Sequence, residues 1–142
     1  MTYPRAEMTL MNANLFSRLF DNLDDPNRLA IETVDGRRIS YGELMARAGQ
    51  MANVLVSSGV KPGDRVAAQT EKSVPALVLY LAAVRAGAVY LPLNTAYTLN
   101  ELEYFITDAE PSMVVCDPSK VEGIGAIAAG VGAKVETLGM GL

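Results

Sequence analysis

The stretch GAVYLPLNTAYTLNELEYFITDAEPSMVVCD, residues 87–117, contains one strand–helix–strand unit and decides the fold. Ala88–Leu91 has the apolar composition of a buried strand. Thr98–Glu101 has the residue types and spacing of a capping box, which predicts a helix that reaches about Ala109. Met113–Cys116 is then a second apolar strand. Two strands joined through a helix indicate a βαβ unit with parallel strands and a right-handed crossover.

Pro92 stops the first strand, and the four residues Asn94–Tyr97 come directly before the predicted helix. An Asx-type turn accounts for this pause, because asparagine side chains commonly bond the backbone two residues further on. Open α/β sheets also bind ligands at the carboxyl ends of strands, where this turn lies. A second loop, Gln69–Ser73, follows another predicted strand, and its residues are equally typical of a solvated helix N-cap. For both loops, a structural role is therefore the preferred interpretation and a ligand-facing role the alternative.

Strands and helices alternate on both sides of this unit. Ser40–Glu43 forms another capping box ahead of an apolar helical stripe, and Gly59 stands where a helix C-cap favours positive φ. The remaining elements expected here are a strand at 65–69, a helix that Ser73 caps, a helix at 121–131 and a strand at 134–138. The sequence therefore predicts an α/β fold, with a mostly parallel sheet and helices on both faces.

The beginning of the chain follows a different pattern. Residues 1–12 have no sustained hydrophobic period and are predicted to be a loose extension, whereas residues 13–142 are predicted to form one partial α/β domain. A helix is predicted from Asn14 to Leu23, ended by the Asp-Asp-Pro that follows. A β-hairpin is predicted near residues 29–39, with Asp35-Gly36 as its two-residue turn.

Bulk composition excludes several classes of protein. The chain has 142 residues, half of them apolar and a fifth charged, as is typical of a globular domain. Its net charge of -4 argues against a nucleic-acid partner. The longest apolar run, Ala76–Val84, is far shorter than the roughly 20 residues of a membrane span, so no membrane association is expected. A mean hydropathy of +0.19 is high for a wholly wet surface and indicates that part of it meets another domain or copy.

The inventory of reactive side chains is also small. Histidine is absent, which excludes imidazole as a base or metal ligand, and no metal site is predicted. The single cysteine, Cys116, lies in an apolar strand, so a buried, inert thiol and a reducing cytoplasm are expected. Gly123–Ala128 matches the dinucleotide pattern G-x-G-x-x-A, but residues 117–122 separate it from the preceding strand. Packing of a helix on the sheet is therefore the preferred interpretation.

The quoted stretch resembles the N-terminal region of adenylate-forming acyl-CoA ligases, the AMP-dependent synthetases. It has their glycine-led strand, PLN turn, helix with a Glu-Leu pair and Asp-x-x-Pro step into the next strand. ISYGELMARAGQMANVL (39–55) and GVKPGDRVA (59–67) resemble the helix and strand that precede it in that family. The resemblance covers about residues 11–138 and implies the N-terminal part of the family's large domain.

The resemblance also implies a reaction. In the complete enzyme a carboxylate attacks ATP with release of pyrophosphate, and coenzyme A then displaces AMP to give a thioester. A small-molecule carboxylate is thus the implied substrate, and ATP, Mg and coenzyme A are the implied cofactors. The family's phosphate loop, adenine-binding segment, ribose-binding aspartate and catalytic lysine have no counterpart here, so no catalytic residue is assigned. By position, Asn94, Thr95 and Ala96 resemble a segment near coenzyme A in some relatives and are assigned to cofactor binding.

We therefore expect a truncated, cytoplasmic N-terminal part of an acid–CoA ligase, whose last strand stops at GMGL without a closing helix. Alone, it is expected to bind none of these cofactors, to be inactive, and to self-associate through exposed apolar surface. Whether the chain is itself an enzyme is left open. The alternative is a non-catalytic α/β module that binds a partner or nucleotide through an open sheet edge. A third hypothesis, an autonomous Rossmann-like cofactor binder, is disfavoured by the position of Gly123 and Gly125.

Overall fold

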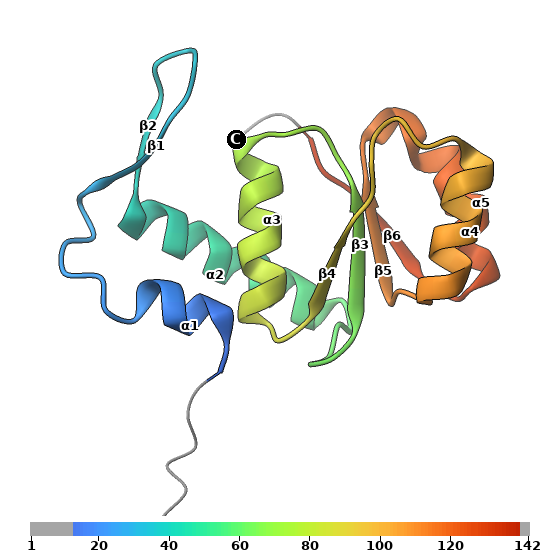
Figure 1. Ribbon diagram of the computed structural model, residues 1–142, viewed down its shortest axis with the longest axis horizontal. Coiled ribbons are helices and arrows are strands. Elements are labelled where there is room, and N and C mark those ends of the chain that lie inside the picture. The colour runs from blue at the N-terminus through green and yellow to red at the C-terminus, as the bar shows by residue number, and fades with distance from the viewer. Residues whose placement is uncertain (1–12, 140–142) are drawn as a thin grey trace, which may run out of the picture.

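The computed structural model describes residues 13–139, and its elements alternate as the sequence predicts (Figure 1). In chain order they are α1 (Leu15–Phe20), β1 (Leu29–Glu32), β2 (Arg38–Ser40), α2 (Tyr41–Ser57), β3 (Arg65–Gln69), α3 (Val74–Arg85), β4 (Val89–Pro92), α4 (Leu99–Ala109), β5 (Met113–Cys116), the 3-10 helix η1 (Pro118–Lys120), α5 (Val121–Gly130) and β6 (Lys134–Thr137). The predicted N-terminal extension, residues 1–12, lies outside the described residues.

Four strands form one parallel sheet, in the order β4-β3-β5-β6. The chain leaves β3 through α3 and adds β4 on one side. It then crosses through α4 to β5 on the other side of β3, and continues through α5 to β6. The connections that leave β3 and β5 therefore run in opposite directions, which is the strand order of flavodoxin-like sheets. This confirms the predicted parallel sheet.

Helices cover both faces of this sheet, as predicted (Figure 1). Because side chains alternate along a strand, Val66 and Ala68 of β3 face one way and Ala67 faces the other. The first face packs against residues of α2 and α3: Ala52, Leu55, Leu79, Ala82 and Ala83. The second packs against residues of α4 and α5: Leu102, Ile106, Ile124 and Ala128. The sheet is thus the middle layer of three.

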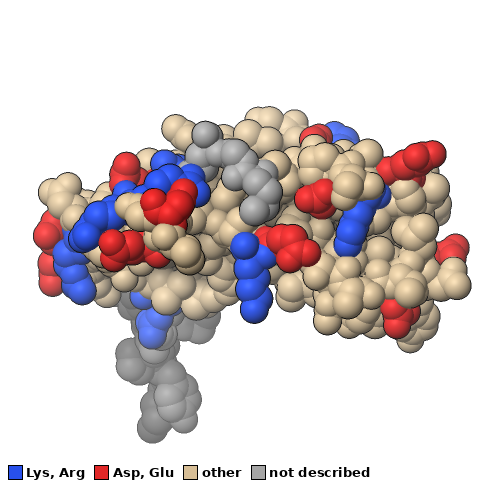
Figure 2. Space-filling view, turned by 90° about the horizontal axis from the view of Figure 1, so that it is seen from above, with Lys and Arg blue, Asp and Glu red and all other residues tan. Residues whose placement is uncertain are grey.

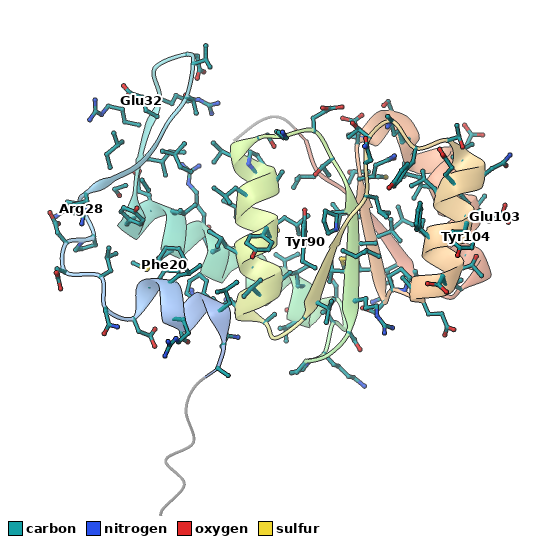
Figure 3. All side chains as sticks on the ribbon, in the orientation of Figure 1. Phe20, Arg28, Glu32, Tyr90, Glu103 and Tyr104 are labelled. Carbon is teal, nitrogen blue, oxygen red and sulfur yellow. The ribbon has the colours of Figure 1, made fainter. Side chains whose placement is uncertain are left out.

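A third apolar cluster joins the N-terminal elements to the outer side of α2 and α3. Its buried members are Phe16, Ile39, Leu44, Ala48, Val78 and Leu81. Phe20, labelled in Figure 3, adds its ring to this cluster from the end of α1, 4.8 Å from the ring of Phe16. The guanidinium of Arg85 lies 5.0 Å above the Phe16 ring and donates to the carbonyl of Met45. The separate two-stranded sheet β1-β2 packs here and not on the parallel sheet.

Two predicted boundaries in this region were wrong. The hairpin itself is confirmed, but its turn has three residues, Val34 to Gly36, because Thr33 N–H donates to Arg37 O and Gly36 takes φ 84°. A type I turn closed by a left-handed residue is the usual three-residue solution. Helix α1 ends at Phe20 and does not reach Leu23. Only one residue of α1 is buried, so little packing energy favours further turns.

The predicted helix starts are confirmed. At α2, Glu43 N–H donates to Ser40 Oγ at 3.2 Å, and Ser40 N–H donates to Glu43 Oε2 at 2.9 Å. Thr98 and Glu101 form the same reciprocal pair at α4. Gly59 follows α2 with φ 100°, as a C-cap glycine should. Within the described part of the chain, no helix is long and apolar enough to cross a membrane.

Candidate functional site

The two loops singled out from the sequence meet at the carboxyl edge of the parallel sheet. The loop after β3 and the turn after β4 line one hollow of about 500 Å³. Its lining residues are Thr70, Glu71, Lys72, Pro92, Leu93, Asn94 and Thr95. Neighbouring parallel strands end side by side, so the segments that follow them are brought together even though residues 73–91 separate them in sequence. Of the three residues assigned to cofactor binding, Asn94 and Thr95 line this hollow.

The turn after β4 is held in shape by its own asparagine. Ala96 N–H donates to Asn94 Oδ1 at 2.9 Å, and Tyr97 N–H donates to Asn94 O at 3.1 Å. This is the Asx-type turn that the sequence predicts. Ala96 is exposed, whereas the Tyr97 ring stacks on Phe105 of α4 at 4.9 Å. The turn therefore presents Asn94–Ala96 outward and anchors its far end in the α4 side of the core.

A buried glutamine lies beneath this turn. Gln69, the last residue of β3, is 1% exposed, and its Nε2 donates to Asn94 O at 2.8 Å. Lys120 approaches from the other side: its Nζ donates to Thr95 O at 3.0 Å and contacts Gln69 Oε1 at 3.4 Å. One ammonium group thus joins the ends of β3, β4 and β5. Sequence reasoning missed Lys120. The available signal was the polar Gln69 directly after the apolar run 66–68 of β3.

A second hollow, of about 280 Å³, opens on the α4 and α5 side of this junction. It is lined by Gln69, Tyr97, Leu99, Leu102, Ser119, Lys120, Gly123 and Ile124. The ends of β3 and β5 flank it, and these are the strands whose connections run in opposite directions. Such a switch point is where open α/β sheets form a crevice for ligands. The candidate site is therefore the pair of hollows on either side of Gln69.

The chemistry available at these hollows is limited. Asp117, just after β5, accepts from Ser119 N–H at 2.9 Å and from Ser119 Oγ at 2.7 Å, and these bonds hold the pKa of its carboxyl below the ordinary value. Burial raises the pKa of the Cys116 thiol, and the neighbouring Asp117 carboxylate raises it further. A thiol that stays protonated is a poor nucleophile. Within residues 13–139, no group of three acidic or cysteine side chains is placed to hold a metal ion.

The glycines of the G-x-G-x-x-A pattern lie inside α5 and not at a strand–helix turn. A Cβ at Gly123 would lie 2.9 Å from Leu99 Cδ2, so this glycine lets α5 approach α4 closely. A Cβ at Gly125 would meet nothing within 4 Å. Neither backbone is arranged to receive a pyrophosphate, and the packing interpretation is the one that the geometry fits.

The fold agrees with comparisons to known proteins. The AMP-binding enzyme family matches residues 21–138, and the chain belongs to this family, that of adenylate-forming acyl-CoA ligases. Among solved structures it is similar to MatB, the malonyl-CoA synthetase of Rhodopseudomonas palustris, at 78% identity and a TM-score of 0.89. That match covers 91% of this chain and 26% of MatB, which was solved with ATP bound. From the sequence alone, two stretches predict a likeness to malonyl-CoA synthetase: NANLFSRLFD (12–21) and TEKSVPALVLYLAAVRAGAVYLPLNTAYTLNEL (70–102).

Curated relatives cover a wider range of substrates at lower identity. Feruloyl-CoA synthase of an Amycolatopsis species is 37% identical over 95 residues, which is 67% of this chain and 19% of that protein. Tyrocidine synthase 1 of Brevibacillus parabrevis is 33% identical over 94 residues, or 66% of this chain and 8% of that protein. The chain thus spans less than a fifth of these relatives, and only about a quarter of MatB.

Proposed function

We propose that this chain forms the N-terminal part of the large domain of an ATP-dependent acid–CoA ligase, and that the complete enzyme makes malonyl-CoA from malonate, ATP and coenzyme A, with release of AMP and pyrophosphate. The 78% identity to MatB over 91% of the chain carries the proposal. Mg²⁺ belongs to it as the cation that offsets charge on the reacting phosphate oxygens. Because the proposed enzyme uses ATP and coenzyme A, which are found inside the cell, we place it in the cytoplasm.

The geometry of the site supports the idea that this chain forms one wall of the cleft, while the rest of the enzyme supplies the reacting groups. Two lysines line the pair of hollows: Lys120 is engaged by the carbonyl of Thr95 and by Gln69, and Lys72 lines the hollow between the ends of β3 and β4. The site's thiol is buried and protonated. Apart from Lys72 and Glu71, the remaining lining consists of uncharged side chains and a fixed turn, which suits one side of a cleft. We therefore assign the reacting groups to the rest of the enzyme, and expect no ATP, Mg²⁺ or coenzyme A to bind this chain alone.

The test is a chimera in which residues 13–139 replace the matching segment of MatB. Malonate-dependent release of AMP from ATP and coenzyme A is measured, with MatB itself and MatB lacking the segment as controls. We expect turnover close to that of MatB, and a preference for malonate over acetate that matches it. A chimera that folds but turns over neither acid would contradict the proposal.

The turn residues Asn94, Thr95 and Ala96 are proposed to face coenzyme A in the complete enzyme. Exposure of Ala96 and the hollow beside Asn94 and Thr95 support this. Coenzyme A carries several phosphate charges, so a charge at position 96 should change its KM selectively. In the chimera, Ala96→Asp should raise the KM for coenzyme A, while Ala96→Lys should not and the KM for ATP should stay constant. Equal effects of both charges would count against this assignment.

Exposed apolar side chains support self-association of the isolated chain. Val54 and Val56 at the end of α2 are 56% and 55% exposed, and Val89 on the outer strand β4 is 51% exposed. Val54 also borders a further hollow, lined largely by apolar residues of α2 and α3. Figure 2 shows broad uncharged areas between the scattered charges on one face. Sedimentation equilibrium should give a mass above that of a monomer, and Val54→Lys should lower it; monomers at all concentrations would contradict this.

A non-catalytic module remains the second candidate, because two edges of the parallel sheet are unpaired. Among the described residues, β4 pairs only with β3 and β6 only with β5. Unpaired edges accept an added strand from a partner. Pro92 weakens β4 as an acceptor, so Lys134–Thr137 of β6 is the better candidate. A proline at Val135 or Glu136 that abolishes partner capture but not the chimera's turnover would favour this function.

A further inference from the structure

Lys120 lies near the start of one continuous helical run, in which η1 leads directly into α5. Asp117 caps this run, because its Oδ1 accepts from Ser119 N–H at 2.9 Å and Pro118 holds the first helical position. Lys120 itself has helical backbone angles, and its side chain makes no capping hydrogen bond. A cation is unfavourable near a helix start, since the N-terminus of a helix carries partial positive charge. The local helix therefore does not account for a lysine at this position.

The side chain of Lys120 is used elsewhere. It reaches across the sheet edge to Thr95 O, 25 residues away in sequence, and to Gln69 Oε1, 51 residues away. Both contacts are partly buried, where a hydrogen bond from an ammonium group is stronger than at the open surface. A residue that breaks a local rule in this way commonly serves a non-local one.

The turn depends on such a connection. Leu93 N–H still donates to Ala68 O in the manner of a sheet, at 2.8 Å. From Asn94 to Ala96 the turn's other bonds are its own, apart from those to Gln69 and Lys120. Gln69 holds the carbonyl of Asn94, and Lys120 holds the next carbonyl along. Two successive peptide groups are thereby fixed to the ends of β3 and β5.

We propose that Lys120 is a positioning residue for the ligand-facing turn: it clamps the Thr95 carbonyl so that Asn94–Ala96 keeps one shape at the edge of the cleft. This rests on the proposed function for what the turn meets, namely coenzyme A. Lys120 acts through the turn and touches no reacting atom. A fixed turn lowers the entropy lost when the cofactor is bound.

The first experiment measures amide hydrogen exchange at Ala96 and Tyr97 in the 142-residue chain. Lys120→Met removes the donors and keeps the length of the side chain, Lys120→Arg keeps a cationic donor, and Lys61→Met is the matched loss of charge at the opposite edge of the sheet. Exchange should rise about tenfold or more in Lys120→Met, as loss of a charged hydrogen bond implies. It should be largely restored in Lys120→Arg and unchanged in Lys61→Met.

Lys120→Ser separates positioning from general stability. Serine, like methionine, removes the ammonium donor, so exchange at Ala96 and Tyr97 should rise as it does in Lys120→Met, while core amides keep most of their protection. If Lys120 had only a general structural role, its replacement by serine would lower the denaturation midpoint and raise amide exchange throughout the sheet. Unchanged exchange in both variants, or a rise that extends equally to core amides such as that of Ala52, would overturn the inference.

The second experiment uses the MatB chimera. Lys120→Met should raise the KM for coenzyme A several-fold and leave the KM for ATP unchanged, with rescue by Lys120→Arg. If Lys120→Met exchanges faster at Ala96 and Tyr97 but its KM for coenzyme A is unchanged, the assignment of the turn to coenzyme A is overturned, and with it that part of the proposed function. Unchanged exchange would overturn the clamp itself. The two failures are thus distinguishable.

Discussion

Single side chains decide where the helices of this domain begin, and Thr98 is the case most open to test. Its Oγ1 accepts from Glu101 N–H at 3.3 Å, and its own N–H donates to Glu101 Oε2 at 2.7 Å. Thr98→Ala removes the side-chain half of this pair and should lower the free energy of unfolding by about 0.5–2 kcal/mol. Denaturant titration measures the loss, and Thr98→Ser is the control that should keep most of the stability. An unchanged midpoint in Thr98→Ala would argue against the cap.

Cys116 gives a second prediction on the same scale. The thiol is fully buried, and burial together with the Asp117 carboxylate raises its pKa above the ordinary value. Less thiolate is therefore present at pH 8 than in a free cysteine, and the reagent has no access. Alkylation at pH 8 should be about a hundredfold slower, or more, in the folded chain than in urea, because a core strand must open first. Comparable rates in the two states would show that β5 is not a core strand.

Two glycines in and after α5 test how backbone conformation decides the effect of a glycine-to-alanine substitution on stability. A Cβ at Gly125, inside the helix, would meet nothing within 4 Å, and the same is true of Gly132, which follows the helix with φ 70°. Gly125→Ala should stabilise the fold by about 0.4–1 kcal/mol, because alanine has less freedom to lose on folding. Gly132→Ala should destabilise it by roughly 1–2 kcal/mol, since alanine is strained at positive φ. Thermal unfolding of the pair measures both, and a loss of stability in Gly125→Ala would show that the space beside Gly125 is not open.

The elements that were predicted correctly are those whose signals are local. The two capping boxes, Gly59 and the apolar strand at 113–116 carry their evidence within a few residues, and each lies where it was expected. The errors arose where packing decides. Helix α1 is short because part of its apolar stripe stays exposed, with Leu15 at 44% and Leu19 at 55%. Helical period alone does not reveal whether a stripe finds a partner.

The candidate site was predicted only in part, for the same reason. The turn at 94–97 and the loop at 69–73 could be assigned to the carboxyl edge from the alternation of strands and helices. Their meeting at Gln69 and the contribution of Lys120 could not, because those contacts span 25 and 51 residues. A lysine at the start of a helix gives no hint of where its ammonium group lies. Only the order β4-β3-β5-β6 brings these residues together.

For the chain as a whole, the last prediction concerns catalysis: alone, it should not adenylate malonate or any other acid. Adenylation requires donors and cations arranged in advance around the triphosphate, because charge develops on its oxygens in the transition state. At the carboxyl edge, the Lys120 ammonium is directed to Thr95 and Gln69, and residues 13–139 hold no cluster for a metal ion. Orientation of two reactants supplies roughly 7–11 kcal/mol of a barrier, which one wall of a cleft does not provide. The measurement is malonate-dependent exchange of labelled pyrophosphate into ATP, with the active MatB chimera as positive control. Exchange that scales with the concentration of the purified chain would show that the reacting groups lie within these 142 residues after all.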